Sequence, residues 1–293
     1  MNSKTDIRDK AYLTENEINL LNFISDLPTR HFRMHYRQGL RSHIFEVLNK
    51  DDVLKETEGE VVDGSLRFPR AVPQYMLRIL RARFTSLDLV LDEVKRYSLI
   101  LKYLGSDLIA KSEEFIVEYT GTGKSEIVLC GLQEYIQGEI LDPWSLFGPT
   151  PLVTFYEHRF PGNNPEKKTI ENATNAIATF VKQTRQMIND TGYIPDLAGN
   201  GNLIMTPGGG IKLVDINNII RVVQNDTIAL DDKNYPACDK SVEVLALFEQ
   251  KIIEKENPLD DPLFQHFLSV DRKKIVSKLE NKFFQSISSL SAL

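Results

Sequence analysis

Two carboxylates and two carboxamides lie close together in one stretch of the chain, Tyr193 to Asp215. Asp196 begins a polar loop that also carries Asn200 and Asn202, and Asp215 ends the stretch. Carboxylate and amide oxygens are the ligands that hard cations such as Mg2+ take in proteins. The stretch therefore predicts a cation site, provided that the surrounding elements bring these side chains together.

A predicted β-hairpin supplies that positioning. Residues 203–205 are an apolar run typical of a buried strand, and residues 211–214 form a second one. Between them, residues 206–210 combine threonine, proline and three glycines, which is turn chemistry because glycine allows positive φ and proline opens a turn. The second strand would deliver Asp215 beside the polar loop.

This order of parts resembles the core of the protein-kinase-like superfamily, where a catalytic Asp is followed by an Asn, a hydrophobic hairpin and a metal-binding Asp. The resemblance implies that Asp196 orients the acceptor hydroxyl, that Asn202 and Asp215 hold Mg2+, and that ATP is the nucleotide. Asn200 remains an alternative to Asn202 as the metal ligand. The implied fold is α+β and two-lobed, with an antiparallel β N-lobe carrying one long helix and a mainly helical C-lobe, and with nucleotide in the cleft between the lobes.

The resemblance also implies nucleotide-binding residues in the first half of the chain. Residues 43–48 predict a strand, residues 49–51 a turn, and residues 53–55 the next strand. Lys55 would then be the phosphate-binding lysine, or alternatively a solvated charge near a strand end. Gly39 would be the one glycine of the phosphate-covering loop.

A long helix is predicted over residues 86–104, because its apolar residues recur at helical spacing and Gly105 follows its end. In the resemblance, Glu93 of this helix orients the phosphate-binding lysine, and Asp92 is the nearest rival. The preceding segment, residues 72–84, has a helical pattern with three arginines: Arg78, Arg81 and Arg83. These predict a solvated helix face, with a phosphate or acidic-partner site as the alternative.

Two strands are predicted at residues 115–119 and 126–130, joined by a loop that ends in Gly123-Lys124-Ser125. That ending looks like a phosphate-binding P-loop, which needs a glycine five positions before Gly123 and a helix after it. Glu118 stands where the motif needs that glycine, and a predicted strand follows Ser125 where the motif needs a helix. The loop is therefore interpreted as a hairpin turn.

The segment that follows, residues 131–141, resembles the kinase hinge, where a strand ends in an acidic and aromatic pair before a glycine. The resemblance implies that the backbone of Gln133, Glu134 and Tyr135 contacts an adenine edge. Further helices are predicted from apolar spacing at residues 170–188, 239–248 and 262–284.

The predicted organisation has three parts. Residues 1–30 form an N-terminal helical extension, which begins at a capping box around Thr14 and closes at Pro28. Residues 31–135 form the kinase-like N-lobe, with an insertion over about residues 56–85. Residues 136–293 form the kinase-like C-lobe.

Composition narrows the class of protein. The 293 residues are 42% hydrophobic and 26% charged, which is ordinary for a globular protein, and the formal charge of −6 does not favour nucleic acid as a partner. There is no apolar signal core or membrane-length apolar run, so we expect a cytoplasmic protein with no membrane partner. Two cysteines give neither a disulfide framework nor a cysteine-based zinc site.

Departures from the family pattern shape the functional prediction. Ile194 and Pro195 precede Asp196 where the family has other residues, and Asn202 is one residue further from Asp196. The segment from residue 215 to residue 239 is short and has no Ala-Pro-Glu, which leaves little room for an activation loop. These features favour an atypical or small-molecule kinase, similar to aminoglycoside or lipopolysaccharide kinases.

We therefore expect an ATP- and Mg2+-dependent phosphotransferase, with a small molecule or a protein as the unknown acceptor. The alternative is a catalytically inactive pseudokinase that acts as a regulatory or binding module. The sparse glycine loop and the altered residues before Asp196 motivate this alternative.

Overall fold

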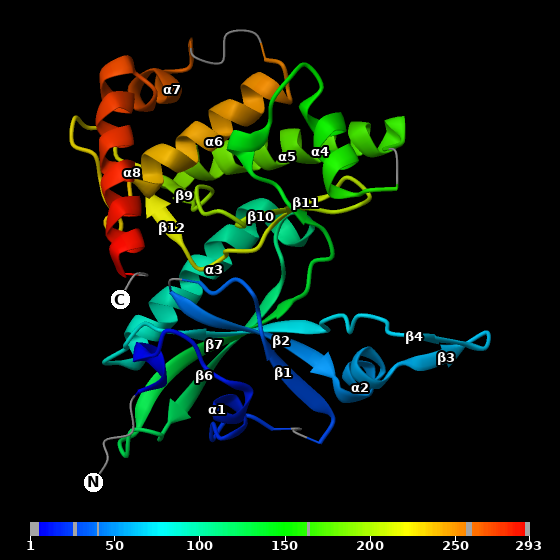
Figure 1. Ribbon diagram of the computed structural model, residues 1–293. Coiled ribbons are helices and arrows are strands. Elements are labelled where there is room, and N and C mark those ends of the chain that lie inside the picture. The colour runs from blue at the N-terminus through cyan, green and yellow to red at the C-terminus, as the bar shows by residue number, and fades with distance from the viewer. Residues whose placement is uncertain (1–5, 26–27, 40, 163–164, 256–259, 291–293) are drawn as a thin grey trace. The chain divides into compact units, whose positions relative to one another are not determined.

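The computed structural model describes residues 6–25, 28–39, 41–162, 165–255 and 260–290. The chain forms two compact units (Figure 1), one made of Met1–Lys95 and Lys111–Tyr135, the other of Arg96–Ala110 and Ile136–Leu293. Helices and antiparallel sheets make up the structure, so the fold class is α+β, as predicted.

A five-stranded antiparallel sheet is the centre of the first unit, with the spatial order β1-β2-β5-β7-β6. Its strands are β1 (Arg30–Met34), β2 (Ser42–Asn49), β5 (Tyr75–Leu80), β6 (Ser112–Tyr119) and β7 (Glu126–Glu134). The strands predicted at residues 43–48, 115–119 and 126–130 are confirmed. Residues 120–125 join two antiparallel partners, β6 and β7, so the segment that looks like a P-loop is a hairpin turn.

Helix α3 (Leu87–Leu108) packs against one face of this sheet and confirms the predicted long helix. Val90 forms a buried cluster with Leu80 of β5 and Leu129 of β7. Gly105 has a non-helical backbone, with φ 69° and ψ 170°, and interrupts the helix at the glycine that the sequence marks as its end. The helix belongs to the first unit up to Lys95 and to the second from Arg96.

The N-terminal segment covers the opposite face of the sheet. It contains a 3-10 helix, η1 (Ile7–Asp9), and one short helix, α1 (Glu15–Asn19), which has the predicted capping box at Thr14. The predicted continuation of this helix to Pro28 is wrong. After Asn19 the chain leaves the helix, and Leu21 is buried against the sheet while Leu20 is exposed.

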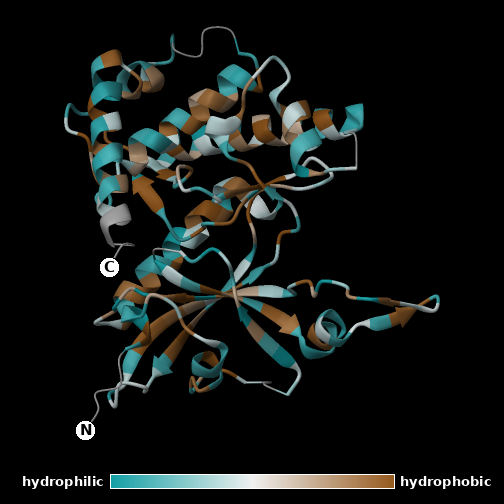
Figure 2. Cartoon of the chain, viewed as in Figure 1, coloured by the Kyte–Doolittle hydropathy of each residue, from teal (hydrophilic) through white to brown (hydrophobic). Residues whose placement is uncertain are grey.

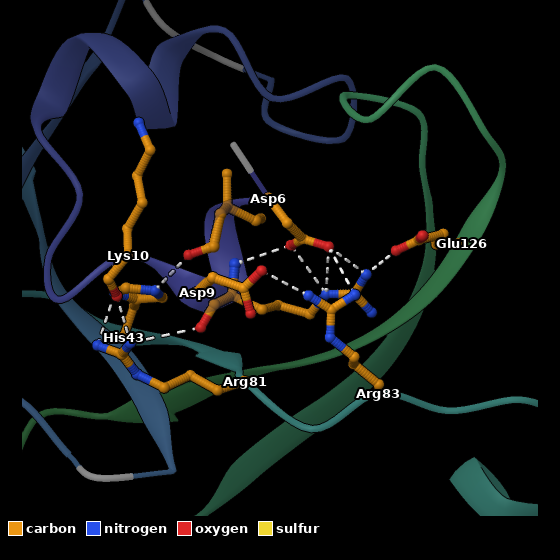
Figure 3. A network of polar contacts seen from close by, with 9 residues as sticks. Asp6, Asp9, Lys10, His43, Arg81, Arg83 and Glu126 are labelled. Atoms are coloured by element: carbon orange, nitrogen blue, oxygen red, sulfur yellow. Dashed lines mark hydrogen bonds and ion pairs between the residues drawn. The ribbon is translucent and has the colours of Figure 1, made fainter. Parts of the chain in front are cut away.

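A polar network ties this N-terminal segment to the sheet (Figure 3). Arg8, only 5% exposed, donates to Asp6 at 2.6 Å and also pairs with Glu126 of β7. Arg83, which follows β5, pairs with Asp6 at 3.1 Å and with Asp9 at 2.7 Å. Buried charges are tolerated when they are paired, so these contacts fix where the segment lies on the sheet.

Between β2 and β5 the chain forms a helix and a hairpin, α2 (Lys50–Glu58), β3 (Glu60–Val62) and β4 (Ser65–Arg67). The predicted strand at residues 53–55 is therefore wrong, because these residues lie in α2. The Asn49 side chain caps this helix by accepting from the Asp51 N–H at 2.8 Å, and Gly59 ends it. Asn-Lys-Asp is thus a helix start, although the same residues also suit a turn.

The helix predicted over residues 72–84 is also wrong, because β5 occupies residues 75–80 in the middle of the sheet. Leu77 and Ile79 are buried in the core under the N-terminal segment. Arg78 alternates with them and points to the other face, in keeping with the period-two geometry of a strand. The arginines of this segment are therefore not a solvated helix face.

The second unit is mainly helical. Its helices are η2 (Pro143–Ser145), α4 (Pro151–Arg159), α5 (Lys167–Thr191), α6 (Ala237–Lys251), α7 (Pro262–Phe267) and α8 (Val270–Leu290). The helices predicted at residues 170–188, 239–248 and 262–284 are confirmed, the last as two helices. Buried Phe180 of α5 and Phe248 of α6 belong to one large apolar core, and Figure 2 shows hydrophobic and hydrophilic residues along both helices.

Two small antiparallel sheets complete the second unit. One has the order β11-β10-β8, with β8 (Glu139–Ile140), β10 (Leu203–Met205) and β11 (Ile211–Leu213). The other pairs β9 (Tyr193–Pro195) with β12 (Ile219–Arg221). The β10–β11 pair confirms the predicted hairpin. Across the described ranges, no helix combines the length and apolarity that crossing a membrane requires.

Acid should lower the free energy of unfolding of the first unit, because His43 is buried in its neutral form. This fully buried side chain lies 2.8 Å through Nε2 from the Ile7 carbonyl and 3.3 Å through Nδ1 from the Arg81 guanidinium, an arrangement that suits the neutral ring. Burial and the charge of Arg81 lower the pKa of His43 to about 4. The unfolded chain binds the proton first, so stability should fall as pH drops from about 6.5 to about 4, by at most about 3 kcal/mol.

Hydrogen exchange of the β2 amides, measured between pH 7 and pH 4.5, tests this expectation. His43→Gln should flatten the pH dependence, because the amide does not titrate, whereas the exposed His158→Gln should leave it unchanged. Identical pH profiles for wild type and His43→Gln would contradict the assignment.

Candidate functional site

Asp196 follows β9 directly, inside the second unit. Its backbone N–H donates to the Asn218 carbonyl at 2.9 Å, which extends the β9–β12 pairing by one residue. The next N–H, of Leu197, donates to the Ser241 hydroxyl of α6 at 3.0 Å. The segment before β12 and helix α6 therefore both fix the backbone at Asp196.

The Asp196 side chain is only 7% exposed. Its Oδ1 accepts from the Ala198 N–H at 3.0 Å, and its Oδ2 accepts from the Asn218 side-chain amide at 2.7 Å. The first bond is local, of the kind that aspartate makes with the backbone two residues on. Together the two bonds fix the orientation of the carboxylate.

Asn202 connects this loop to the hairpin. Its side-chain amide donates to the Asp196 carbonyl at 2.9 Å, and its own carbonyl accepts from the Val214 N–H at 2.8 Å. The space is tight, because a Cβ at Gly199 would lie 2.5 Å from the Asn202 amide. Asn202 is buried and bonded to the Asp196 backbone, whereas Asn200 is exposed.

Asp215 lies in a segment that is tied to the same loop at both ends. Val214, one residue before it, bonds to Asn202, and Asn218, three residues after it, bonds to Asp196. The structure therefore brings Asp196, Asn202 and Asp215 into one small region. The sequence indicates the hairpin that contributes to this convergence, and the bonds from Asn218 to Asp196 are a finding of the structure.

The turn of the hairpin is anchored as well. Gly209 has φ 94°, and a Cβ there would lie 2.6 Å from the Thr169 carbonyl of α5. The Tyr156 hydroxyl of α4 donates to the Thr206 carbonyl at 2.8 Å, and Asn172 of α5 donates to the Gly208 carbonyl at 3.2 Å. The helices thus set the direction in which β11 delivers Asp215.

The donor set suits a hard cation. Asn202 commits its N–H2 group to the Asp196 carbonyl, which identifies the other atom of this amide as the acceptor oxygen. Mg2+ is usually held by one or two carboxylates together with waters and substrate phosphates, so Asn202 and Asp215 are of the right kind. Within the described part of the chain, no three His, Cys, Asp or Glu side chains group as a metal site.

Lys55 does not occupy the predicted position. It lies in α2 rather than in the sheet, its side chain is 48% exposed, and its ion-pair partners are Asp52 and Glu60. The predicted pairing with Glu93 is therefore not made, although Glu93 lies in α3 as expected. The cause is that residues 49–51 begin a helix instead of forming a turn, so the strand that follows β2 in the sheet is β5 and not residues 53–55.

Arg78 is the charged residue whose surroundings differ most from the predicted solvated helix face. It lies on β5, is only 6% exposed, and donates to Glu114 at 2.6 Å and to Ser112 at 3.0 Å, both on β6. Gly131 of β7 lies between them, and a Cβ there would be 2.7 Å from the Arg78 guanidinium. The available signal was a single charge alternating with apolar residues, which indicates a strand facing two environments.

The remaining predicted residues lie in the first unit. Gly39 is in the loop between β1 and β2, where Gln38 donates to the carbonyls of His35 and Ile44. Gln133 and Glu134 end β7, and the Glu134 N–H donates to the Lys111 carbonyl at 2.8 Å. Tyr135 is the last residue of the unit.

No protein-family model matches this chain, and a comparison with curated proteins also finds no match.

Replacing Gly209 with alanine should destabilise the hairpin that positions Asp215. Alanine at positive φ costs about 1–2 kcal/mol, and the contact with the α5 backbone adds to this, so we expect a loss of about 2 kcal/mol or more. Urea unfolding followed through Trp144, the single tryptophan, reports on this unit.

Gly208→Ala is the matched control, because nothing lies within 4 Å of a Cβ at Gly208 and its φ is not in the left-handed region. This variant should differ from wild type by less than about 1 kcal/mol. Equal stability of the two variants would show that the turn does not constrain the hairpin.

Proposed function

We propose that the chain is a two-lobed, protein-kinase-like phosphotransferase that uses ATP and Mg2+. The observation that carries this proposal is the double attachment of the segment around Asp215 to the loop between Asp196 and Asn202. This attachment holds the backbone at Asp215 near Asp196 and Asn202, whose side chains would supply an orienting carboxylate and ligands for a hard cation. The residues with proposed roles in catalysis all belong to the second unit.

Each of the three residues has a proposed role. Asp196 would orient the acceptor hydroxyl and accept its proton, with its carboxylate held by Ala198 and Asn218. Asn202 and Asp215 would hold Mg2+, which when bound neutralises charge on the nucleotide phosphates. Phosphoryl transfer asks mainly for positioning and charge stabilisation, which a fixed hydrogen-bonded loop supplies.

The architecture of each unit supports the same proposal. The first has an antiparallel sheet against which the first part of the long helix α3 packs, and the second is mainly helical. Between Asp215 and α6 only one short strand, β12, intervenes. This short connection supports an atypical or small-molecule kinase, because a peptide-binding activation segment needs more chain. The acceptor is a small molecule or a protein.

A second candidate is a pseudokinase that serves as a regulatory or binding module. Two observations favour it. Lys55 is an exposed helix residue, and Arg78, the buried cation of the sheet, pairs with Glu114. A phosphate-facing cation is one of the parts that an active kinase needs.

Mg2+-dependent stabilisation by ATP, followed by ATP hydrolysis, tests the proposal. Ligand at about 100 times its dissociation constant stabilises the folded state by about 2.7 kcal/mol, so the wild type should melt several degrees higher with ATP and Mg2+ together. Asp215→Ala should lose both the shift and the hydrolysis. Asp226→Ala, an exposed aspartate in the same region of sequence, is the matched control.

Three outcomes are distinguishable. A shift with hydrolysis that Asp215→Ala removes supports the phosphotransferase. A shift without hydrolysis supports the pseudokinase. The absence of any shift in the wild type contradicts the phosphotransferase.

A further inference from the structure

Strand β11, which leads to Asp215, is bonded along both of its edges. On one edge it pairs with β10. On the other edge Leu213 forms a parallel bridge with Ile109, and the Leu213 carbonyl accepts from the Ala110 N–H at 2.9 Å. Ile109 and Leu213 are both fully buried. The residues that follow α3 therefore cover the outer edge of this strand, and Figure 1 shows the end of α3 beside β10 and β11.

Lys212 connects the same strand to the end of α3 through its side chain. Its Nζ donates to the Ser106 carbonyl at 2.7 Å and to the Ile109 carbonyl at 3.2 Å. Lys212 alternates along β11 with Ile211 and Leu213, which are buried in the core, so its side chain leaves from the other face of the strand. The two bonds join residues that are 106 and 103 positions apart in the sequence.

The carbonyls that Lys212 binds lie at a helix end. Gly105 interrupts α3, and Ser106 lies in the last turn, which ends at Leu108. The last carbonyls of a helix have no N–H partner within the helix, so a lysine there can bond to them, and its charge interacts favourably with the helix dipole. Ile109 is fully buried, so its carbonyl needs a partner within the protein. Lys212 supplies one.

The attachment through Lys212 bears on Asp215 because the two residues are close along the chain. Three extended residues span no more than about 11 Å. The Val214 N–H, which donates to the Asn202 carbonyl at 2.8 Å, holds the segment to the loop. Lys212 holds it to the end of α3. These attachments lie one and three residues before Asp215, so the direction in which the backbone presents this carboxylate depends on both.

We propose that Lys212 is a positioning residue for Asp215, which acts through the backbone of β11 by fixing the strand to the end of α3. This inference rests on the proposed function, in which Asp215 holds Mg2+. A ligand that is already fixed in place loses less freedom when the ion binds. Lys212 therefore strengthens Mg2+ binding without touching the ion, the nucleotide or the acceptor.

Lys251 provides a matched control. It is a second lysine of the same unit whose Nζ donates to a backbone carbonyl, that of Leu146, at 2.7 Å. This bond joins the end of α6 to the residue after η2 and involves no residue of the hairpin. Lys212→Met and Lys251→Met each remove a lysine that binds backbone carbonyls, whereas Lys212→Arg keeps the charge and the donors.

Hydrogen exchange of residues 213–216 in the full chain tests the positioning. Lys212→Met should speed exchange of the Val214 amide at least about fivefold, because β11 loses its attachment to α3. Lys212→Arg should restore the wild-type rate, and Lys251→Met should leave it unchanged. No acceleration in Lys212→Met would overturn the proposal. Equal acceleration in Lys251→Met would do the same, because it would indicate a general loss of stability.

A Mg2+ titration at fixed ATP, followed through the melting temperature, tests the consequence for the metal. Lys212→Met should raise the Mg2+ concentration for half-maximal stabilisation at least about threefold, which is less than the loss of a direct partner of a metal ligand usually costs. Lys212→Arg and Lys251→Met should match the wild type.

The titration separates this inference from the proposed function. Wild type that gains no stability from Mg2+ and ATP contradicts the proposed function and, with it, the role of Lys212 in metal binding. A wild-type shift with the same Mg2+ midpoint in every variant leaves the proposed function standing and overturns the inference about Lys212.

Discussion

The candidate site depends on one constraint, the hydrogen bonding of buried backbone in the loop between β9 and β10. Buried backbone groups must find partners, and here the loop finds them in the segment that follows the hairpin. Asn202 accepts from Val214, and Asp196 donates to Asn218. The positions of the three proposed functional residues follow from this pairing. A loop that lost either bond would leave a buried polar group unsatisfied, at a cost of about 1–3 kcal/mol.

Much of this region could be predicted because its signals are local. The proline and glycines of the turn, the apolar runs on both sides and the polar loop before them specify a hairpin without reference to distant residues. The choice between Asn200 and Asn202 was not accessible in this way. Both are amides in the same loop, and only the pairing with Val214 decides which one is buried against Asp196.

The errors occurred where local signals suit two structures or where partners are distant in sequence. Asn49 with Asp51 and Asp52 suits a turn as well as a helix cap. The turn predicts a strand that contains Lys55, whereas in the structure the cap begins α2 and Lys55 lies in that helix. Arg78, Arg81 and Arg83 resemble a solvated face because their partners, acids for Arg78 and Arg83 and backbone carbonyls for Arg81, come from other elements. Glu114 lies 36 residues from Arg78, so no window of sequence shows the two together.

The first unit has paired charges on both faces of its sheet. On one face Arg78 of β5 pairs with Glu114 of β6, and on the other Arg8 of the N-terminal segment pairs with Glu126 of β7. Burying such pairs contributes little net stability, but losing one partner costs several kcal/mol. The Arg8–Glu126 pair therefore fixes where the N-terminal segment lies on the sheet, and the Arg78–Glu114 pair links two strands of the sheet itself.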